Sequence, residues 1–168
     1  GSEMCIRDSF YQITSASNGL LWLIGEFGTV WKSNNQGNSW ESLDIDYEGT
    51  LFGGVPLIKS ESIIVHGLQG NIFRFKNGSI WEKIDSPTNA ILHRGTQLKD
   101  GQLVFAAGAG ELLLGSDKSR FFQVVKLSDK AAVPTDLWQS EDGSLLLTTD
   151  RGVLRITLSE LNKSKLND

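Results

Sequence analysis

The chain has 168 residues, of which 39% are hydrophobic, enough for one domain with its own core. Its formal charge of −4 at neutral pH excludes a general nucleic-acid binder, because such proteins need a basic surface to displace counterions from phosphates. No apolar run approaches the ~20 residues that a membrane-spanning helix needs, so we expect no direct membrane insertion.

The first nine residues are set apart from the rest. Residues 1–3 look like the remnant of an appended tag, and residues 4–9 resemble the conceptual translation of a transposase sequencing adapter. On this interpretation residues 1–9 are not native, and the chain is the C-terminal portion of a longer protein. The alternative is an ordinary start at Met4. Cys5, the only cysteine, lies in this segment, so we expect no disulfide in the rest of the chain.

From residue 10 onward the sequence repeats itself about every 41 residues. A glycine that follows a hydrophobic run returns at spacings of 42, 40 and 42: Gly28, Gly70, Gly110 and Gly152. Large aromatic side chains return at spacings of 41 and 41: Trp40, Trp81 and Phe122. Internal periodicity of this length is typical of repeat architectures, and it is the strongest signal in the chain.

Each repeat predicts four short strands. In the first repeat these cover 11–16, 20–24, 29–33 and 39–45. Polar turns rich in Gly, Asn and Asp separate the runs, as antiparallel hairpins require. The pattern predicts an all-β fold, a partial β-propeller of about four four-stranded antiparallel blades, the last lacking its outer strand. The blades are expected at about 10–46, 54–87, 95–128 and 136–158, followed by a polar tail at 159–168.

A turn motif in the first repeat carries a family resemblance. Ser33-x-Asn35-x-Gly37-x-x-Trp40 resembles the Asp-box, or BNR repeat, with Asn35 in place of the usual aspartate, and later copies are more degraded. The Gly-x-x-Gly element that ends at Gly28 is similar to that of the Ycf48-like propellers, which are photosystem II assembly factors. The physical role of the motif is structural: side-chain oxygens hold the turn, and the aromatic residue packs between blades.

The resemblance implies a non-catalytic scaffold that binds a protein partner, without cofactor or metal, in an exported, periplasmic or thylakoid-lumenal location. Ycf48-like propellers have about seven blades, which implies that this chain is a C-terminal portion. Four open blades would expose unpaired edges, so we expect either pairing with a second copy in a ring of eight or an open arc. The alternative is a carbohydrate-binding or sialidase-like Asp-box propeller. Sialidases hold a carboxylate with three arginines, and only Arg94 and Arg151 are placed for a shared rim. We therefore expect that the chain is not an enzyme.

The turns between the second and third strands vary in sequence while their frame repeats, so specificity is expected there. With the entry to the third repeat and a tryptophan of the fourth, they form the candidate binding rim: Glu26, Phe27, Gln69, His93, Arg94, Trp138, Asp150 and Arg151. Ordinary solvated hairpin tips are the alternative. His66, inside a predicted interior strand, is expected to be a hydrogen-bonded core residue. No His, Cys, Asp or Glu spacing indicates a metal site.

Overall fold

The computed structural model describes residues 9–58, 60–76, 80–120, 122–127, 132–157 and 159–161. These residues form short strands joined by tight turns, with one 3₁₀ turn, η1 (Leu68–Gly70), and a short helical turn at 159–161. The strands are β1 (Phe10–Ser15), β2 (Leu21–Gly25), β3 (Val30–Ser33), β4 (Glu41–Leu43), β5 (Leu51–Pro56), β6 (Ile63–Gly67), β7 (Ile72–Lys76), β8 (Ile80–Ile84), β9 (Leu92–Gln97), β10 (Gln102–Ala107), β11 (Glu111–Ser116), β12 (Gln123–Lys126), β13 (Pro134–Gln139), β14 (Leu145–Thr149) and β15 (Gly152–Ile156). No helix among the described residues is long and apolar enough to cross a membrane.

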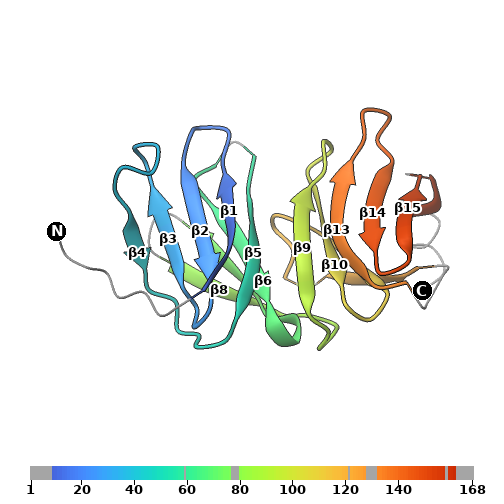
Figure 1. Ribbon diagram of the computed structural model, residues 1–168, viewed down its shortest axis with the longest axis horizontal. Coiled ribbons are helices and arrows are strands. Elements are labelled where there is room, and N and C mark those ends of the chain that lie inside the picture. Colours follow the sequence, from blue (N-terminus) through green and yellow to red (C-terminus); the bar gives the residue numbers. More distant parts are fainter. Residues whose placement is uncertain are drawn as a thin grey trace.

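Consecutive strands pair antiparallel in four sheets, ordered β1-β2-β3-β4, β5-β6-β7-β8, β9-β10-β11-β12 and β13-β14-β15. We call these sheets blades 1 to 4. They are arranged as the blades of a β-propeller, which confirms the predicted fold (Figure 1). Among the described residues, blade 4 has three strands, whereas each of the others has four.

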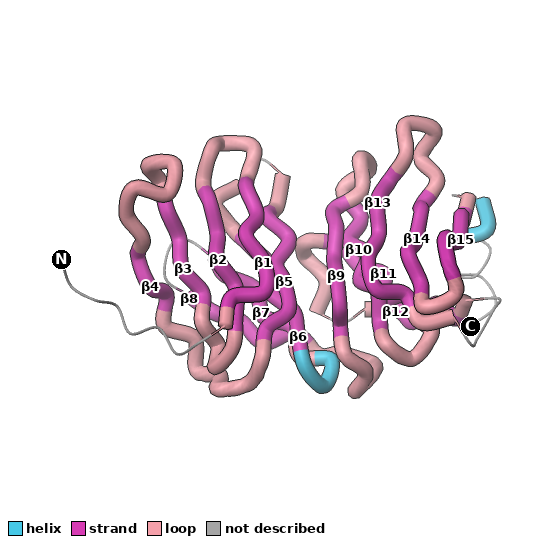
Figure 2. Tube along the Cα trace, in the orientation of Figure 1, coloured by secondary structure: helices cyan, strands magenta, loops and turns pink. Residues whose placement is uncertain are grey.

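The innermost strands β1, β5, β9 and β13 lie side by side at the centre of the molecule (Figure 1), and neighbouring members of this series are in contact. Blades 1 and 4 stand at opposite ends of the arrangement (Figure 2). The turns that join the second strand of each blade to the third all emerge on one side, toward the bottom of the view. We call these the rim turns. Because the inner strands also begin on this side, strand starts and rim turns lie together.

The hydrophobic core consists of three clusters, one at each junction between neighbouring blades. Apolar side chains alternate along the strands, so that each inner blade packs against both neighbours. The repeated aromatic residues Trp81 and Phe122 lie at these junctions. The ring centroids of Trp81 and Phe75 are 4.9 Å apart, and those of Phe122 and Phe105 are 5.2 Å apart. Trp40 instead lies beside Gly37 on blade 1. Among the described residues no blade precedes blade 1.

Candidate functional site

Each inner strand contains one extra residue close to its start. Pairing with the second strand skips one residue in every blade, which is the mark of a β-bulge. The skipped residues recur at spacings of 41, 41 and 42: Tyr11, Phe52, His93 and Thr135. Because a bulge re-aims the side chain that it carries, the fold places four side chains in one row across the four inner strands.

Three members of this row are aromatic and contact one another. The rings of Tyr11 and Phe52 meet edge to face with centroids 5.2 Å apart, and those of Phe52 and His93 lie 6.4 Å apart. Tyr11 is 46% exposed, and the other two are half-buried. We call Tyr11, Phe52 and His93 the aromatic row. It forms a partly exposed apolar strip that crosses three blades, and exposed Thr135 continues it onto the fourth.

Backbone hydrogen bonds fix the rim turns to the starts of the inner strands. In every blade the first residue of the rim turn donates its N–H to a carbonyl two residues before the bulge, over 2.8 to 3.3 Å. The pairs are Glu26 to Ser9, Leu68 to Thr50, Gly108 to Ile91 and Asp150 to Val133. The rim turns and the row are therefore one connected unit, and side chains on both are presented from a fixed frame.

Carboxylates strengthen this connection at the two end blades. Glu26 Oε2 accepts the N–H of Ser9 at 3.2 Å, and Asp150 Oδ1 accepts the N–H of Val133 at 2.8 Å. Glu26 Oε1 also accepts a 2.9 Å hydrogen bond from the hydroxyl of Tyr11. That bond lowers the pKa of Glu26 and raises the pKa of Tyr11. At neutral pH the blade 1 end of the row therefore carries a carboxylate beside an aromatic ring.

The other end of the aromatic row carries an ion pair. Arg94 Nε lies 3.2 Å from Asp136 Oδ1, which joins β9 of blade 3 to β13 of blade 4, although the angle is not that of a hydrogen bond. His93 precedes Arg94 on β9, and its partial burial lowers its pKa. His93 is consequently neutral near pH 7, and the charge beside it belongs to the Arg94–Asp136 pair.

The structure brings most of the predicted rim residues to one side of the molecule. Phe27 is 65% exposed on the first rim turn, and Gln69, Asp150 and Arg151 lie on the later rim turns. Trp138 is not among them. It pairs with Leu146 next to the β13–β14 turn, toward the opposite end of the inner strand, and is 60% exposed there.

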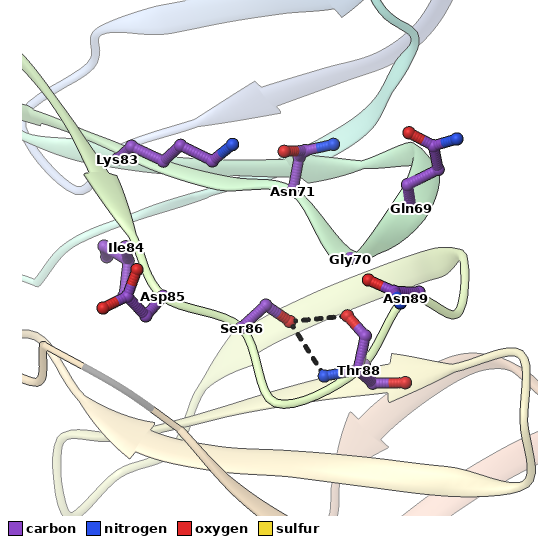
Figure 3. A pocket seen from close by; sticks show the side chains of 9 residues that line it. All are labelled: Gln69, Gly70, Asn71, Lys83, Ile84, Asp85, Ser86, Thr88 and Asn89. Carbon is purple, nitrogen blue, oxygen red and sulfur yellow. Dashed lines mark hydrogen bonds between the residues drawn. The ribbon is translucent and has the colours of Figure 1, made fainter.

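A polar pocket opens beside the rim turn of blade 2. Its volume is about 650 Å³. Figure 3 shows the residues that line it: Gln69, Gly70, Asn71, Lys83, Ile84, Asp85, Ser86, Thr88 and Asn89. The floor is built by hydrogen bonds, since Asn71 Nδ2 donates to the carbonyl of Leu68 at 2.9 Å and Ser86 Oγ donates to the carbonyl of Thr88 at 3.1 Å. Amides and hydroxyls dominate the lining, so the pocket suits a polar backbone or side chain better than an apolar group.

Arg74, Arg94 and Arg155 do not gather around one site. Arg74 is buried on β7, where Nη1 lies 3.2 Å from Glu82 Oε2 and Nη2 donates to the carbonyl of Ser119 at 2.7 Å. Arg155 pairs with Asp142 on blade 4, and Arg94 pairs with Asp136. A shared carboxylate would need these guanidinium groups to converge. This arrangement gives no support to the sialidase-like alternative.

Sequence reasoning missed Tyr11 and Phe52, the two residues that make the row aromatic. The signal was present in the spacing, because Tyr11, Phe52 and His93 are 41 residues apart, as Trp40 and Trp81 are. It was overlooked because the glycine alignment emphasises turns, whereas these residues lie inside strands. His66 is fully buried, as expected for a core histidine, and its Nδ1 lies 3.0 Å from the carbonyl of Leu92.

No protein-family model matches the chain, and no curated protein matches it in sequence. Solved structures do match. Virginiamycin B lyase from Staphylococcus aureus superimposes with a TM-score of 0.79 at 15% identity, covering 91% of this chain and 54% of that one. YCF48 bound to D1 peptide gives 0.68 at 16%, covering 91% and 52%, and the WD40 propeller domain of Doa1 gives 0.71 at 12%, covering 90% and 52%. The fold is a β-propeller. The chain spans about half the length of each of these structures.

These structures correct the expectation that the chain is not an enzyme. Virginiamycin B lyase is an enzyme, and one of the matching structures is a catalytically inactive variant of it with quinupristin. A propeller frame similar over 91% of this chain therefore carries catalysis. The fold and the missing sequence motifs gave no ground for excluding enzymatic activity.

Proposed function

We propose that this propeller binds a protein partner through the aromatic row and the rim turns around it. The observation that carries the proposal is the row itself. Three aromatic side chains in contact, partly exposed and held by bulges, form an apolar strip on a rigid frame. Aromatic side chains supply large contact area at little cost in conformational entropy, and they are enriched where binding energy is concentrated.

The charges at the ends of the row define the kind of segment that would fit. Glu26 offers an acceptor beside Tyr11, and the Arg94–Asp136 pair flanks His93. A segment with apolar side chains over the rings and a hydrogen-bond donor near Glu26 would fit the row and its Glu26 end. The likeness to YCF48, solved bound to D1 peptide, supports a peptide-like partner. A role as an assembly factor of the Ycf48-like kind is part of this proposal and rests on resemblance.

Selection from a random peptide library on the immobilised chain tests the proposal. Selected peptides should lose about tenfold in affinity for Tyr11→Ala, since truncation of an aromatic side chain that carries binding energy costs more than ~1 kcal/mol. Tyr11→Phe should lose less, because it keeps the ring and removes only the bond to Glu26. Ile80→Ala is the matched control, an exposed apolar residue on outer strand β8. Equal binding by Tyr11→Ala and the unchanged chain would refute the proposal.

We also propose that a second copy of the chain packs against the end blades. Each end blade exposes large apolar side chains, with Ile13 62% exposed on blade 1 and Trp138 60% exposed on blade 4. Packing one end face on the other would bury surfaces of the kind that the inner blades already bury against each other. Sedimentation velocity should show a dimer that Trp138→Lys dissociates. A monomer at all concentrations would contradict self-association and leave the peptide proposal intact.

A further inference from the structure

We propose that the polar pocket beside the rim turn of blade 2 binds a neutral saccharide. Its volume of about 650 Å³ lies within the range of small-molecule sites, about 300–1,000 Å³. Blade 2 has a neighbour on each side, because β5 contacts both β1 and β9. The residues that line the pocket all belong to blade 2 or to the connection that leaves it. The pocket therefore does not depend on the exposed faces of the end blades.

The pocket exists because one position of the repeat changes in blade 2. Two residues after the last aliphatic residue of the outer strand, blade 1 has Ile45 and blade 3 has Leu127, and both are buried. Blade 2 has Ser86 there, 41 residues from each. A Cβ added to Gly28 would stand 3.2 Å from Ile45 Cγ2, and one added to Gly70 would stand 2.9 Å from Ser86 Oγ. The smaller serine leaves open the volume that an aliphatic side chain fills beside the equivalent glycine.

A second position changes in the same direction. Thr88 stands where the connection after blade 1 has Tyr47, whose ring packs on Phe73 with centroids 4.9 Å apart. The backbone is alike at both places, because the carbonyl oxygen of each residue lies 1.9 Å from where a Cβ on its rim glycine would stand. Blade 2 keeps the frame of the connection and replaces two apolar side chains by hydroxyl groups. Packing alone would not favour that replacement, since it gives up buried apolar area.

Two polar walls face each other across the pocket (Figure 3). One wall carries Lys83 and Asn71, and the other carries Ser86, Thr88 and Asn89. The first wall lies at the ends of the paired strands β7 and β8, and the second lies on the connection to β9. A ligand between these walls would be contacted from two sides.

The groups that are free to bind include both donors and acceptors. Asn71 Nδ2 donates to a backbone carbonyl at 2.9 Å, which leaves its Oδ1 as an acceptor. Within the described part of the chain, the side-chain amides of Gln69 and Asn89 have no hydrogen-bond partner, and each offers a donor and an acceptor. Lys83 Nζ adds a charged donor, which lies 5.9 Å from the ring centroid of Phe73.

This mixture of groups favours a neutral ligand rich in hydroxyl groups. Lys83 is the cation of the lining and Asp85 is its anion, so the pocket has no excess of either charge. A hydroxyl group both donates and accepts, and it can therefore satisfy an amide on either wall. An extended peptide presents its backbone groups along one line and would meet one wall at a time. A compact saccharide carries hydroxyl groups on opposite edges and can bridge the two walls.

Nuclear magnetic resonance on the full chain tests the site directly, because the side-chain amides of Gln69, Asn71 and Asn89 each give their own resonances. The probes are the methyl glycosides of glucose, galactose, mannose and N-acetylglucosamine. At least one of them should shift these resonances saturably. Ser86→Ile gives blade 2 the side chain that blade 1 has, so it should abolish the shifts without lowering the midpoint of urea unfolding.

Lys83→Met is the second variant, and it should weaken binding about tenfold, as expected for loss of a hydrogen bond from a charged donor. Lys126→Met is its matched control, an exposed lysine on outer strand β12 of blade 3, and it should bind as the unchanged chain does. Tyr11→Ala should also leave saccharide binding unchanged. Failure of this site and failure of the aromatic row are therefore distinguishable.

Four outcomes would overturn the proposal. The first is no saturable shift up to ~10 mM glycoside, ten times the Kd of about 1 mM that marks weak recognition. The second is binding that persists in folded Ser86→Ile, and the third is an equal effect of Lys83→Met and Lys126→Met. The fourth is a shift of the same amides by a free amino acid but by none of the glycosides, which would mean that the pocket takes a zwitterion.

Discussion

The imidazole Nδ1 of His66 lies 3.0 Å from the carbonyl oxygen of Leu92, so a histidine of blade 2 is tied to the first residue of the inner strand of blade 3. The ring is fully buried and meets Phe105 edge to face at 5.2 Å. Among the described residues its Nε2 has no hydrogen-bond partner. Burial lowers the pKa of His66 to about 4, so the ring is neutral in the native state near neutral pH.

This contact predicts a pH-dependent stability. An unfolded histidine has a pKa of about 6.5, so the unfolded chain binds the proton more readily than the native one. The free energy of unfolding should fall as the pH is lowered from about 6.5, by about 3 kcal/mol at pH 4, and this contribution should then level off. Urea unfolding at pH 7 and pH 4 measures it. His66→Gln is the control, because it keeps a donor near Leu92 and cannot titrate. The same pH dependence in both proteins would show that His66 is not the cause.

Two glycines with positive φ separate backbone strain from steric clash. Gly70 (φ +69°) lies against the next connection, where an added Cβ would stand 1.9 Å from the carbonyl oxygen of Thr88. Gly101 (φ +90°) has no atom within 4 Å of that point. Gly101→Ala should cost about 1 kcal/mol from backbone strain alone. Gly70→Ala should cost several times more, measured by urea unfolding. Equal costs would mean that the Gly70–Thr88 approach is not rigid.

The turn after β3 predicts a contrast at Asn35. Its Oδ1 accepts hydrogen bonds from Ser33 Oγ and from the N–H of Ser39, both at 3.0 Å, and its Nδ2 donates to Ser39 Oγ at 2.8 Å. Asn35→Asp keeps the acceptor, and the hydroxyl of Ser39 can rotate to donate, so stability should change by less than ~0.5 kcal/mol. Asn35→Ala removes the acceptor and should cost about 1 kcal/mol. Thermal unfolding of the three proteins measures both effects. A larger loss for the aspartate variant would contradict the acceptor role.

The Arg94–Asp136 ion pair should matter little for stability. Both side chains are partly exposed, at 32% and 55%, and the 3.2 Å contact lacks hydrogen-bond geometry. A double-mutant cycle with Arg94→Ala and Asp136→Ala should give a coupling free energy of about 0.5 kcal/mol. The cycle is needed because Asp136 also accepts the N–H of Leu137 at 2.8 Å. A coupling above ~2 kcal/mol would mean that the pair is structural rather than part of the proposed binding surface.

The sequence predicted the blades because their turns need particular backbone geometry. Gly28 and Gly70 both have positive φ, and each lies against the carbonyl of an equivalent residue, Tyr47 or Thr88, so no other residue fits there. A requirement that repeats in the fold leaves a repeat in the sequence. The absence of an outer strand beside β15 was also expected, and the described residues agree with it.

The site was predicted less well, because its defining feature is a pairing register. Tyr11, Phe52 and His93 share a bulge, yet an extra residue in a strand becomes visible only when the partner strand is in place. Trp138 shows the converse. Its assignment to inner strand β13 was easy, but its place along that strand puts it near the β13–β14 turn, away from the rim. Neither position could be read from hydrophobic alternation alone.

The bulges have a consequence for how this surface can change. At a bulge one residue is left out of the ladder, so its side chain contributes little to strand pairing. Thr135 differs in size and polarity from the three aromatic residues of the row, yet the backbone bonds that hold the adjoining rim turns are the same in all four blades. Point substitutions in this row can therefore change the proposed binding surface at little cost to strand pairing, much as variable loops do on an antibody framework, but from within the sheets.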